Sequence, residues 1–207
     1  MGVRKMKRRA IFLDRDGVLN RTYLYRDGKT HPPANLVELE ILPGVEEACN
    51  DLRRAGFLLI VASNQPDVAR GTQSREVVEA INSQLQRDLI LDDFQVCYHD
   101  NQDNCLCRKP KPGLLLKASN SWGIDLPQSF MVGDRWTDIE AGQRVGCKTI
   151  LIGTVPLLDA DRRKPDFQAA SLLDAATWIL KGQKPGPGKK QKTYKPSVTQ
   201  LLKGEEL

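Results

Sequence analysis

The stretch AIFLDRDGVLN, residues 10–20, decides the fold class expected of this chain. An apolar run from Ala10 to Leu13 stops at two aspartates two positions apart, Asp14 and Asp16. A short apolar run that stops at polar residues is typical of a buried strand in a parallel sheet. We therefore expect Asp14 at the carboxyl end of a strand, where open α/β sheets carry their ligand sites.

Further apolar runs follow along the chain, with helical spacing between them. Strands are expected at residues 10–14, 58–63, 94–99, 129–134 and 148–153, and helices at 45–55, 77–85, 112–123, 137–146 and 172–180. Thr137 with Glu140, and Ser171 with Asp174, have the spacing of helix-starting capping boxes. The alternation predicts an α/β fold, a doubly wound parallel sheet covered on both faces.

Charge divides the 207 residues into three parts. Residues 1–9 hold five Lys or Arg and no acid, and residues 181–207 hold seven Lys and two Glu, although the whole chain carries only +5. The part between them is mildly acidic, and the composition after Leu180 shows no burial pattern. We expect a basic N-terminal arm (1–9), one globular domain (10–180) and a basic flexible tail (181–207).

The apolar run after the basic N-terminus is too short for a signal-peptide core or a membrane span. We therefore expect a cytoplasmic protein that does not act at a membrane. Disulfides are rare in that compartment, so clustered cysteines point to metal binding or catalysis.

The strand ends bring acidic groups together. Asp134 ends the run at 129–134 and Asp138 follows four positions later, so these carboxylates should share a sheet edge with Asp14 and Asp16. Carboxylates at one edge repel each other unless a cation joins them, and oxygen ligands of this kind suit Mg²⁺. An isolated D-x-D motif is usually a solvated turn. Here several polar strand ends are expected at the same sheet edge, which favours a functional site.

Four motifs in order, FLDRDGVLN, ASNQ, RKP and MVGDRWTD, resemble those of the haloacid dehalogenase superfamily of phosphohydrolases, over roughly residues 10–153. The resemblance implies that Asp14 is the nucleophile that forms an aspartyl-phosphate and that Asp16 is the general acid and base. It also implies Mg²⁺ held by Asp14, the main-chain carbonyl of Asp16 and Asp134. Ser63 and a lysine would hold the phosphoryl oxygens. Asp138 would orient a metal-bound water, and the alternative is that it binds the metal directly.

The segment CYHDNQDNCLCRKPKPG, residues 97–113, contains two Cys/His pairs of equal spacing. Cys97 and His99 stand two apart at the expected end of a strand, and Cys105 and Cys107 repeat that spacing. A Cys₃His set suits tetrahedral Zn²⁺ with no open position, and therefore a structural site. The alternatives are a disulfide or an unliganded thiol cluster, which would be prone to oxidation. Cys49 and Cys147 are expected in the core.

The same zinc loop occurs in the D-glycero-D-manno-heptose 1,7-bisphosphate phosphatases, the branch that the chain resembles most, and their relatives include the histidinol-phosphatases. That resemblance implies that Lys109 stabilises the transferring phosphoryl group and that Arg108 recognises the substrate. Lys111 is the rival for the lysine role, and Arg108 could instead only cap the loop.

Only 46 residues separate Ser63 from Lys109, which leaves no room for a large cap domain there. Loops must then select the substrate, and the predicted binding residues are Thr22, Tyr23, Leu24, Tyr25, Ser63, Asn64, Gln65, Pro66, Arg108, Lys109 and Arg135. Pro66 departs from the small residue or serine that the family usually has after Asn-Gln.

These observations predict a monomeric Mg²⁺-dependent phosphatase of carbohydrate metabolism that cuts a sugar bisphosphate, the 7-phosphate of D-glycero-D-manno-heptose 1,7-bisphosphate. Histidinol phosphate is the alternative substrate. A nucleic-acid 3′-phosphatase would use the basic ends, but the core has no basic stripe with interleaved aromatic residues. The chain could also be a non-catalytic zinc-containing binding module, but binding alone would not require a positioned nucleophile and acid.

Overall fold

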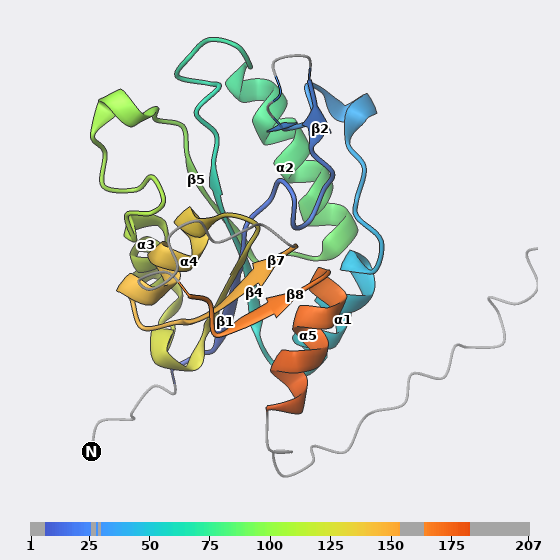
Figure 1. Ribbon diagram of the computed structural model, residues 1–207, viewed down its shortest axis with the longest axis vertical. Helices are drawn as coiled ribbons and strands as arrows, with labels where there is room; N and C mark the ends of the chain where they lie inside the picture. The colour runs from blue at the N-terminus through green and yellow to red at the C-terminus, as the bar shows by residue number, and fades with distance from the viewer. Residues whose placement is uncertain (1–6, 26–27, 29, 154–163, 183–207) are drawn as a thin grey trace, which may run out of the picture.

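A six-stranded parallel sheet forms the centre of the protein. The computed structural model describes residues 7–25, 28, 30–153 and 164–182, and the sheet order is β5-β4-β1-β6-β7-β8 (Figure 1). The strands are β1 (Ala10–Leu13), β4 (Leu58–Asn64), β5 (Asp93–Cys97), β6 (Phe130–Gly133), β7 (Lys148–Ile152) and β8 (Phe167–Ala169). The expected doubly wound parallel sheet is confirmed.

Helices cover both faces of this sheet (Figure 1). They are α1 (Val45–Arg54), α2 (Arg75–Leu89), α3 (Gly113–Trp122), α4 (Trp136–Arg144) and α5 (Leu172–Lys181), with short 3-10 turns at Leu36–Glu38, Asn101–Asp103 and Leu126–Gln128. Ile11 and Leu13 pack toward α1, α2 and α5, whereas Phe12 packs in a second cluster toward α3. Because β1 is buried on both faces, its sequence is continuously apolar rather than alternating.

The strand register places the predicted site. Leu13 pairs with Val61 on one side and with Val132 on the other, so Asp14, Ser63 and Asp134 follow within one or two residues of the same level. The strand order reverses at β1, because β4 and β5 lie to one side and β6, β7 and β8 to the other. Such a switch point is where open α/β sheets bind ligands.

Three details differ from the sequence-based expectation. β8 was not expected, since its three residues are too few to show a pattern. β5 ends at Cys97, so His99 lies beyond the strand rather than at its end. The expected start of α4 at Thr137 is wrong: Trp136 begins the helix, and its cap joins the backbone N–H of Arg135 to the Asp138 carboxylate at 3.1 Å. Ser171 does cap α5, as expected.

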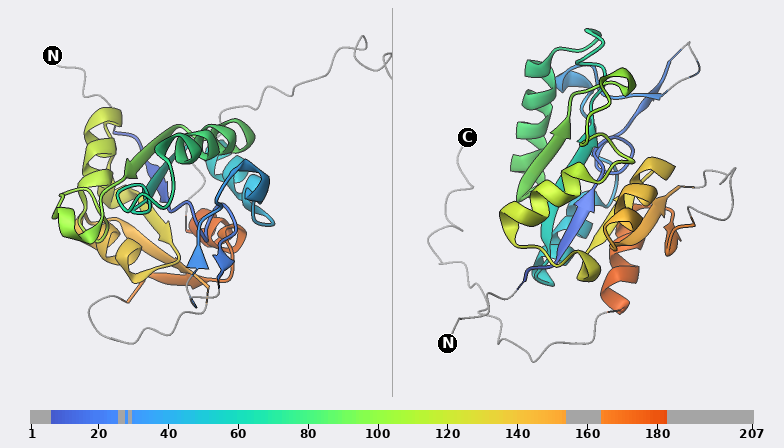
Figure 2. Two further views of the ribbon diagram at one scale, coloured as in Figure 1. Left: turned by 90° about the horizontal axis from the view of Figure 1, so that it is seen from above. Right: turned by 90° about the vertical axis from the view of Figure 1, so that its left-hand side faces the viewer.

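Two segments extend past the carboxyl end of the sheet. The hairpin of β2 (Tyr23–Leu24) and β3 (Thr30–His31) and the loop after β5 both rise beyond this end (Figure 2). Within the described residues, α2, β5 and that loop fill the chain from Ser63 to Lys109, with no inserted domain. No helix in this described part is long and apolar enough to cross a membrane. Most of the predicted arm and tail, 1–6 and 183–207, lie outside the described residues.

Candidate active site

Three carboxylates meet where β1 and β6 end. Asp14, Asp134 and Asp138 each offer an oxygen, and these oxygens lie within 4.8 Å of one another. Two glycines permit the approach: a Cβ at Gly17, whose φ is +89°, would lie 2.4 Å from Asp134 Oδ2, and one at Gly133 would lie 2.2 Å from Asp138 Cβ. The backbone at both strand ends is therefore shaped around this cluster.

Lys109 supplies the positive charge inside the cluster. Its buried Nζ lies 2.9 Å from Asp14 Oδ1 and 2.5 Å from Asp138 Oδ1. The side-chain amide of Asn64 fixes its backbone: Asn64 Nδ2 donates to the Lys109 carbonyl and Asn64 Oδ1 accepts from the Lys109 N–H, both at 3.0 Å. Lys111 instead donates to the carbonyls of Asn104 and Cys105 in the loop after β5.

The cluster perturbs the ionisation of its members. Burial raises the pKa of Asp14 to about 6 against the opposing effect of Lys109, and burial with the neighbouring Asp14 charge raises the pKa of Asp134 to about 7. Burial lowers the pKa of Lys109, but the Asp138 and Asp14 carboxylates outweigh it and raise that pKa above its usual value. One ammonium group thus faces three carboxylates.

This excess of negative charge fits a divalent cation. Asp134 Oδ1 is buried and accepts no hydrogen bond from the part of the chain that the structure describes, and the Arg135 guanidinium approaches it only to 3.9 Å at Nε. A buried carboxylate oxygen without a donor is costly unless a cation occupies the position. Carboxylates clustered in this way are the ligands that Mg²⁺ prefers.

Asp16 points into a separate hydrogen-bond network. Gln65 Nε2 donates to Asp16 Oδ2 at 2.7 Å and to Ser63 Oγ at 2.8 Å. Asn20 Nδ2 donates to Asp16 Oδ1 at 2.9 Å. The Asp16 carboxylate is therefore linked, through Gln65, to the buried hydroxyl at the end of β4.

The four predicted zinc ligands come together. Cys107 Sγ lies 3.2 Å from Cys97 Sγ, 3.5 Å from Cys105 Sγ and 3.3 Å from His99 Nδ1. A tetrahedral Zn²⁺ with Zn–S bonds of about 2.3 Å requires sulfur–sulfur separations of about 3.8 Å, so a slight expansion would accommodate the ion. The donor set fits a structural zinc site, and burial raises the pKa of the Cys97 thiol above its usual value.

Arginines tie the zinc loop to its surroundings. Arg108 Nε donates to Asn101 Oδ1 at 2.8 Å and Nη1 to the His99 carbonyl at 3.3 Å, so its guanidinium crosses the loop. Arg70 forms a double hydrogen bond with Asp100, at 2.9 and 2.6 Å, and holds the pKa of Asp100 at about 2. The segment after β4 and the zinc loop are thereby joined.

The other predicted binding residues lie in or next to the β2–β3 hairpin, at the start of α4, and after β4. Tyr23 donates its hydroxyl to the Glu38 carbonyl, while Leu24 is 75% exposed. The Tyr25 ring packs edge-on against His31 at 4.7 Å between centroids. Arg135 Nη2 donates to Thr30 Oγ1 at 3.4 Å, which links the hairpin to α4. Thr22 precedes β2, and the Pro66 carbonyl accepts from the Arg70 N–H.

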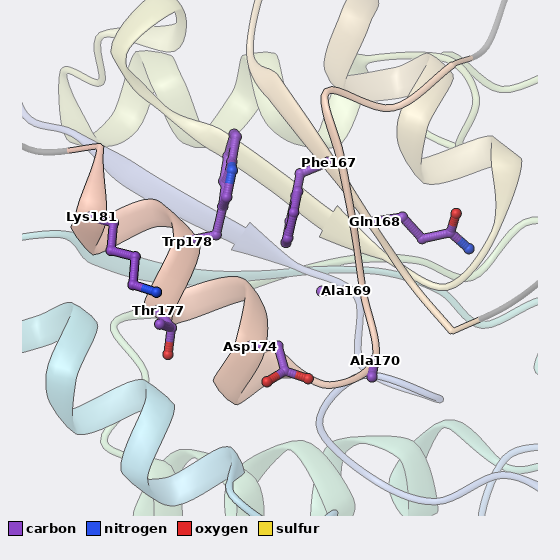
Figure 3. Close-up of a pocket in the computed structure, with 8 residues that line it drawn as sticks. All are labelled: Phe167, Gln168, Ala169, Ala170, Asp174, Thr177, Trp178 and Lys181. Carbon is purple, nitrogen blue, oxygen red and sulfur yellow. The ribbon is translucent and has the colours of Figure 1, made fainter.

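A pocket of about 370 Å³ lies between β8 and α5 (Figure 3). The rings of Phe167 and Trp178 stack in it at 4.7 Å. Its lining residues are Phe167, Gln168, Ala169, Ala170, Asp174, Thr177, Trp178 and Lys181. None of them belongs to the predicted site, and the titratable groups with the chemistry of a hydrolase lie at the ends of β1 and β6.

Sequence reasoning missed several polar residues around the site, among them Asn20, which donates to Asp16. Arg15 lies between the two aspartates that follow β1 and is completely buried, and Asn82 Oδ1 of α2 accepts a hydrogen bond from its Nη1 at 3.0 Å. Arg70 is the bridge to the zinc loop. Asn82 carried a detectable signal, since a polar residue on the face formed by Val78 and Leu85 is unusual.

A doubly wound sheet with this carboxylate and lysine cluster at its switch point defines a hydrolase of the haloacid dehalogenase class. The HAD-hydrolase-like family profile matches residues 106–175. Comparison with known proteins narrows the family. A relative from Escherichia coli K12, named D-glycero-beta-D-manno-heptose-1,7-bisphosphate 7-phosphatase, is 35% identical over 190 residues, which are 85% of this chain and 96% of that protein. The chain therefore belongs to the haloacid dehalogenase-like phosphatases and is a phosphoric monoester hydrolase.

Two other relatives are consistent with this placement. One from Campylobacter jejuni, named D-glycero-alpha-D-manno-heptose-1,7-bisphosphate 7-phosphatase, is 31% identical. The match spans 78% of this chain and 89% of that protein. A crystal structure of the D,D-heptose 1,7-bisphosphate phosphatase of B. bronchiseptica, complexed with magnesium and phosphate, has a TM-score of 0.70 at 27% identity. It covers 84% of this chain and 98% of that one. The substrates in the names of the E. coli and C. jejuni relatives differ in anomer, which is beta in the first and alpha in the second.

Proposed function

We propose that the protein removes the 7-phosphate of D-glycero-D-manno-heptose 1,7-bisphosphate in a Mg²⁺-dependent reaction. The observation that carries the proposal is the contact of Lys109 with both Asp14 and Asp138 beside Asp134, in a chain whose relatives are named for this substrate. We further propose that the protein is a cytoplasmic monomer that acts in carbohydrate metabolism. Its substrate would be a small molecule and not a nucleic acid.

In the proposed first step, a carboxylate oxygen of Asp14 attacks phosphorus and the bond to the sugar oxygen breaks. Asp16 gives its proton to the departing alkoxide. In the second step, Asp16 takes a proton from water, the water oxygen bonds to phosphorus, and the bond to Asp14 breaks. Inorganic phosphate leaves and both carboxyl groups return to their starting states.

The surrounding residues would hold the phosphoryl group during this transfer. Mg²⁺, held by Asp14, the Asp16 carbonyl and Asp134, would neutralise charge and align the phosphate. Lys109 and the Ser63 hydroxyl would bind the oxygens on which charge develops. Asn64 and Gln65 support the proposal, because their amides already fix Lys109 and link Ser63 to Asp16.

The rest of the substrate would meet the loops. Arg108 offers a planar fork for the distal 1-phosphate, and the structural Zn²⁺ held by Cys97, His99, Cys105 and Cys107 would fix the loop that carries it. Contacts with the sugar are proposed for Pro66 and Arg135 and for the segment from Thr22 to Tyr25, which includes Tyr23 and Leu24. The cationic amine of histidinol phosphate would gain nothing from an arginine at that position.

The test is a turnover panel of heptose bisphosphate, fructose 1,6-bisphosphate, histidinol phosphate and a 3′-phosphorylated oligonucleotide. Heptose bisphosphate should give the highest kcat/KM, and Asp14→Asn should abolish turnover of every substrate. Arg108→Ala should lower kcat/KM about thirtyfold, or about 2 kcal/mol, for bisphosphates alone. Arg144→Ala, a surface arginine paired with Glu140, is the control. A higher kcat/KM for histidinol phosphate or for the oligonucleotide would overturn the substrate assignment.

A further inference from the structure

Arg15 is a completely buried arginine that binds one residue of the proposed chemistry. Its Nε donates to both oxygens of Asp16, at 3.1 and 3.2 Å, and its Nη2 donates to Asp16 Oδ2 at 3.0 Å. The planar guanidinium fork restricts the tilt of a carboxylate as well as its position. The orientation of Asp16 therefore depends on where Arg15 is held.

Asn82 holds the far side of that guanidinium. It lies on the buried face of α2, among apolar neighbours such as Ile81 and Leu85, and its Oδ1 accepts Arg15 Nη1 at 3.0 Å. Its Nδ2 is buried and has no hydrogen-bond partner among the described residues. A buried amide with an unsatisfied donor destabilises the fold relative to a leucine of similar shape. The hydrogen bond to Arg15 is the interaction in the structure that accounts for an amide at this buried position.

We infer that Asn82 and Arg15 are positioning residues that hold the Asp16 carboxyl group in the orientation from which it acts as general acid. The inference rests on the proposed function, in which Asp16 protonates the departing alkoxide. Asn20 and Gln65 also donate to Asp16, but each supplies a single bond to one oxygen. Among the described residues, the fork of Arg15 is the only group that contacts both oxygens, and Asn82 is the only side chain outside the DRDG stretch that binds this fork.

The experiment compares two leaving groups in Asn82→Leu. Fructose 1,6-bisphosphate releases an alkoxide that needs a proton, whereas 4-nitrophenyl phosphate releases a phenolate that does not. kcat/KM reports only the steps up to loss of the leaving group, so the second half-reaction does not obscure the comparison. We expect kcat/KM to fall at least about tenfold for the sugar phosphate and less than about threefold for the aryl ester.

Two further variants separate positioning from stability. Leu85→Ala removes a core side chain from the same helix face and should lower Tm without changing the ratio of the two kcat/KM values. Asn82→Asp keeps an acceptor at Oδ1 and should hold that ratio within about twofold of the wild-type ratio. The ratio comes from a single preparation and is independent of the fraction of folded enzyme, so a partly unfolded variant still gives a result.

Asp16→Asn distinguishes this inference from the proposed function. If Asp16→Asn lowers both kcat/KM values equally, the acid role of Asp16 in the proposed function is wrong. If Asp16→Asn changes the ratio but Asn82→Leu does not, or if Asn82→Leu behaves as Leu85→Ala does, the positioning inference alone is overturned.

Discussion

Replacing Lys109 with methionine tests the electrostatics of the site directly. Methionine keeps the apolar length of the side chain but removes the ammonium, which is 2.9 Å from Asp14 and 2.5 Å from Asp138. Removal of one partner from a buried ion pair destabilises a protein by about 3–5 kcal/mol, because the other charge stays buried and unpaired. We expect a loss of this size in the free energy of unfolding near pH 8 without divalent metal.

The loss should depend on pH in a defined direction. Burial raises the pKa of Asp14 to about 6 and that of Asp134 to about 7, both above the value of 3.8 for an unperturbed aspartate. A carboxyl group with a raised folded-state pKa stabilises the fold below its unfolded pKa, and this contribution is lost as pH rises through the folded pKa. Near pH 5 Asp14 and Asp134 are largely protonated, so the Lys109→Met deficit should be smallest there and should grow toward pH 8.

The assay is urea unfolding of the metal-free protein near pH 5 and near pH 8, with Lys111→Met as the control. Lys111 loses only its hydrogen bonds to two loop carbonyls, so its deficit should be about 1–2 kcal/mol and independent of pH in this range. A Lys109→Met deficit equal to that of Lys111→Met, or one that does not grow with pH, would refute the reasoning. Activity provides a second reading: Lys109→Met should lower kcat at least about a hundredfold.

Three further outcomes are expected. Cys107→Ser should lose one zinc per chain by elemental analysis and lower activity, whereas Cys147→Ser, in the core, should keep the metal; zinc-free wild-type protein would contradict this. Asp134→Asn should make the metal-free protein more stable near pH 8, because it removes a buried carboxyl whose pKa is raised to about 7. It should also abolish the rise in Tm that Mg²⁺ gives the wild type, and a Mg²⁺-induced rise in this variant would exclude Asp134 as a ligand. Deleting residues 183–207 should leave kcat/KM for a small substrate within about twofold, since the predicted site lies entirely before them; a larger fall would place the tail in the site.

The sequence alone predicted where the carboxylates gather. Apolar runs identify parallel strands, and the carboxyl ends of such strands lie at one edge, so Asp14 and Asp134 were expected to share that edge; the pairing of β1 with β6 then makes them neighbours. The Cys₃His cluster was predictable for a similar reason: two pairs of ligands separated by a short loop can approach each other with little freedom. In both cases local pattern and short connections determine the geometry.

Only the tertiary structure decided which of the polar side chains complete the site. The resemblance favoured Lys109 over Lys111, but the contact that holds the Lys109 backbone comes from the Asn64 amide, 45 residues away, and only the structure shows it. The contact of Arg15 with Asn82 spans 67 residues and joins β1 to a face of α2 that the pattern marks only as apolar. A side-chain hydrogen bond between distant segments depends on how helices pack on the sheet to within a fraction of an ångström, and hydrophobic periodicity fixes which face is buried but not that distance.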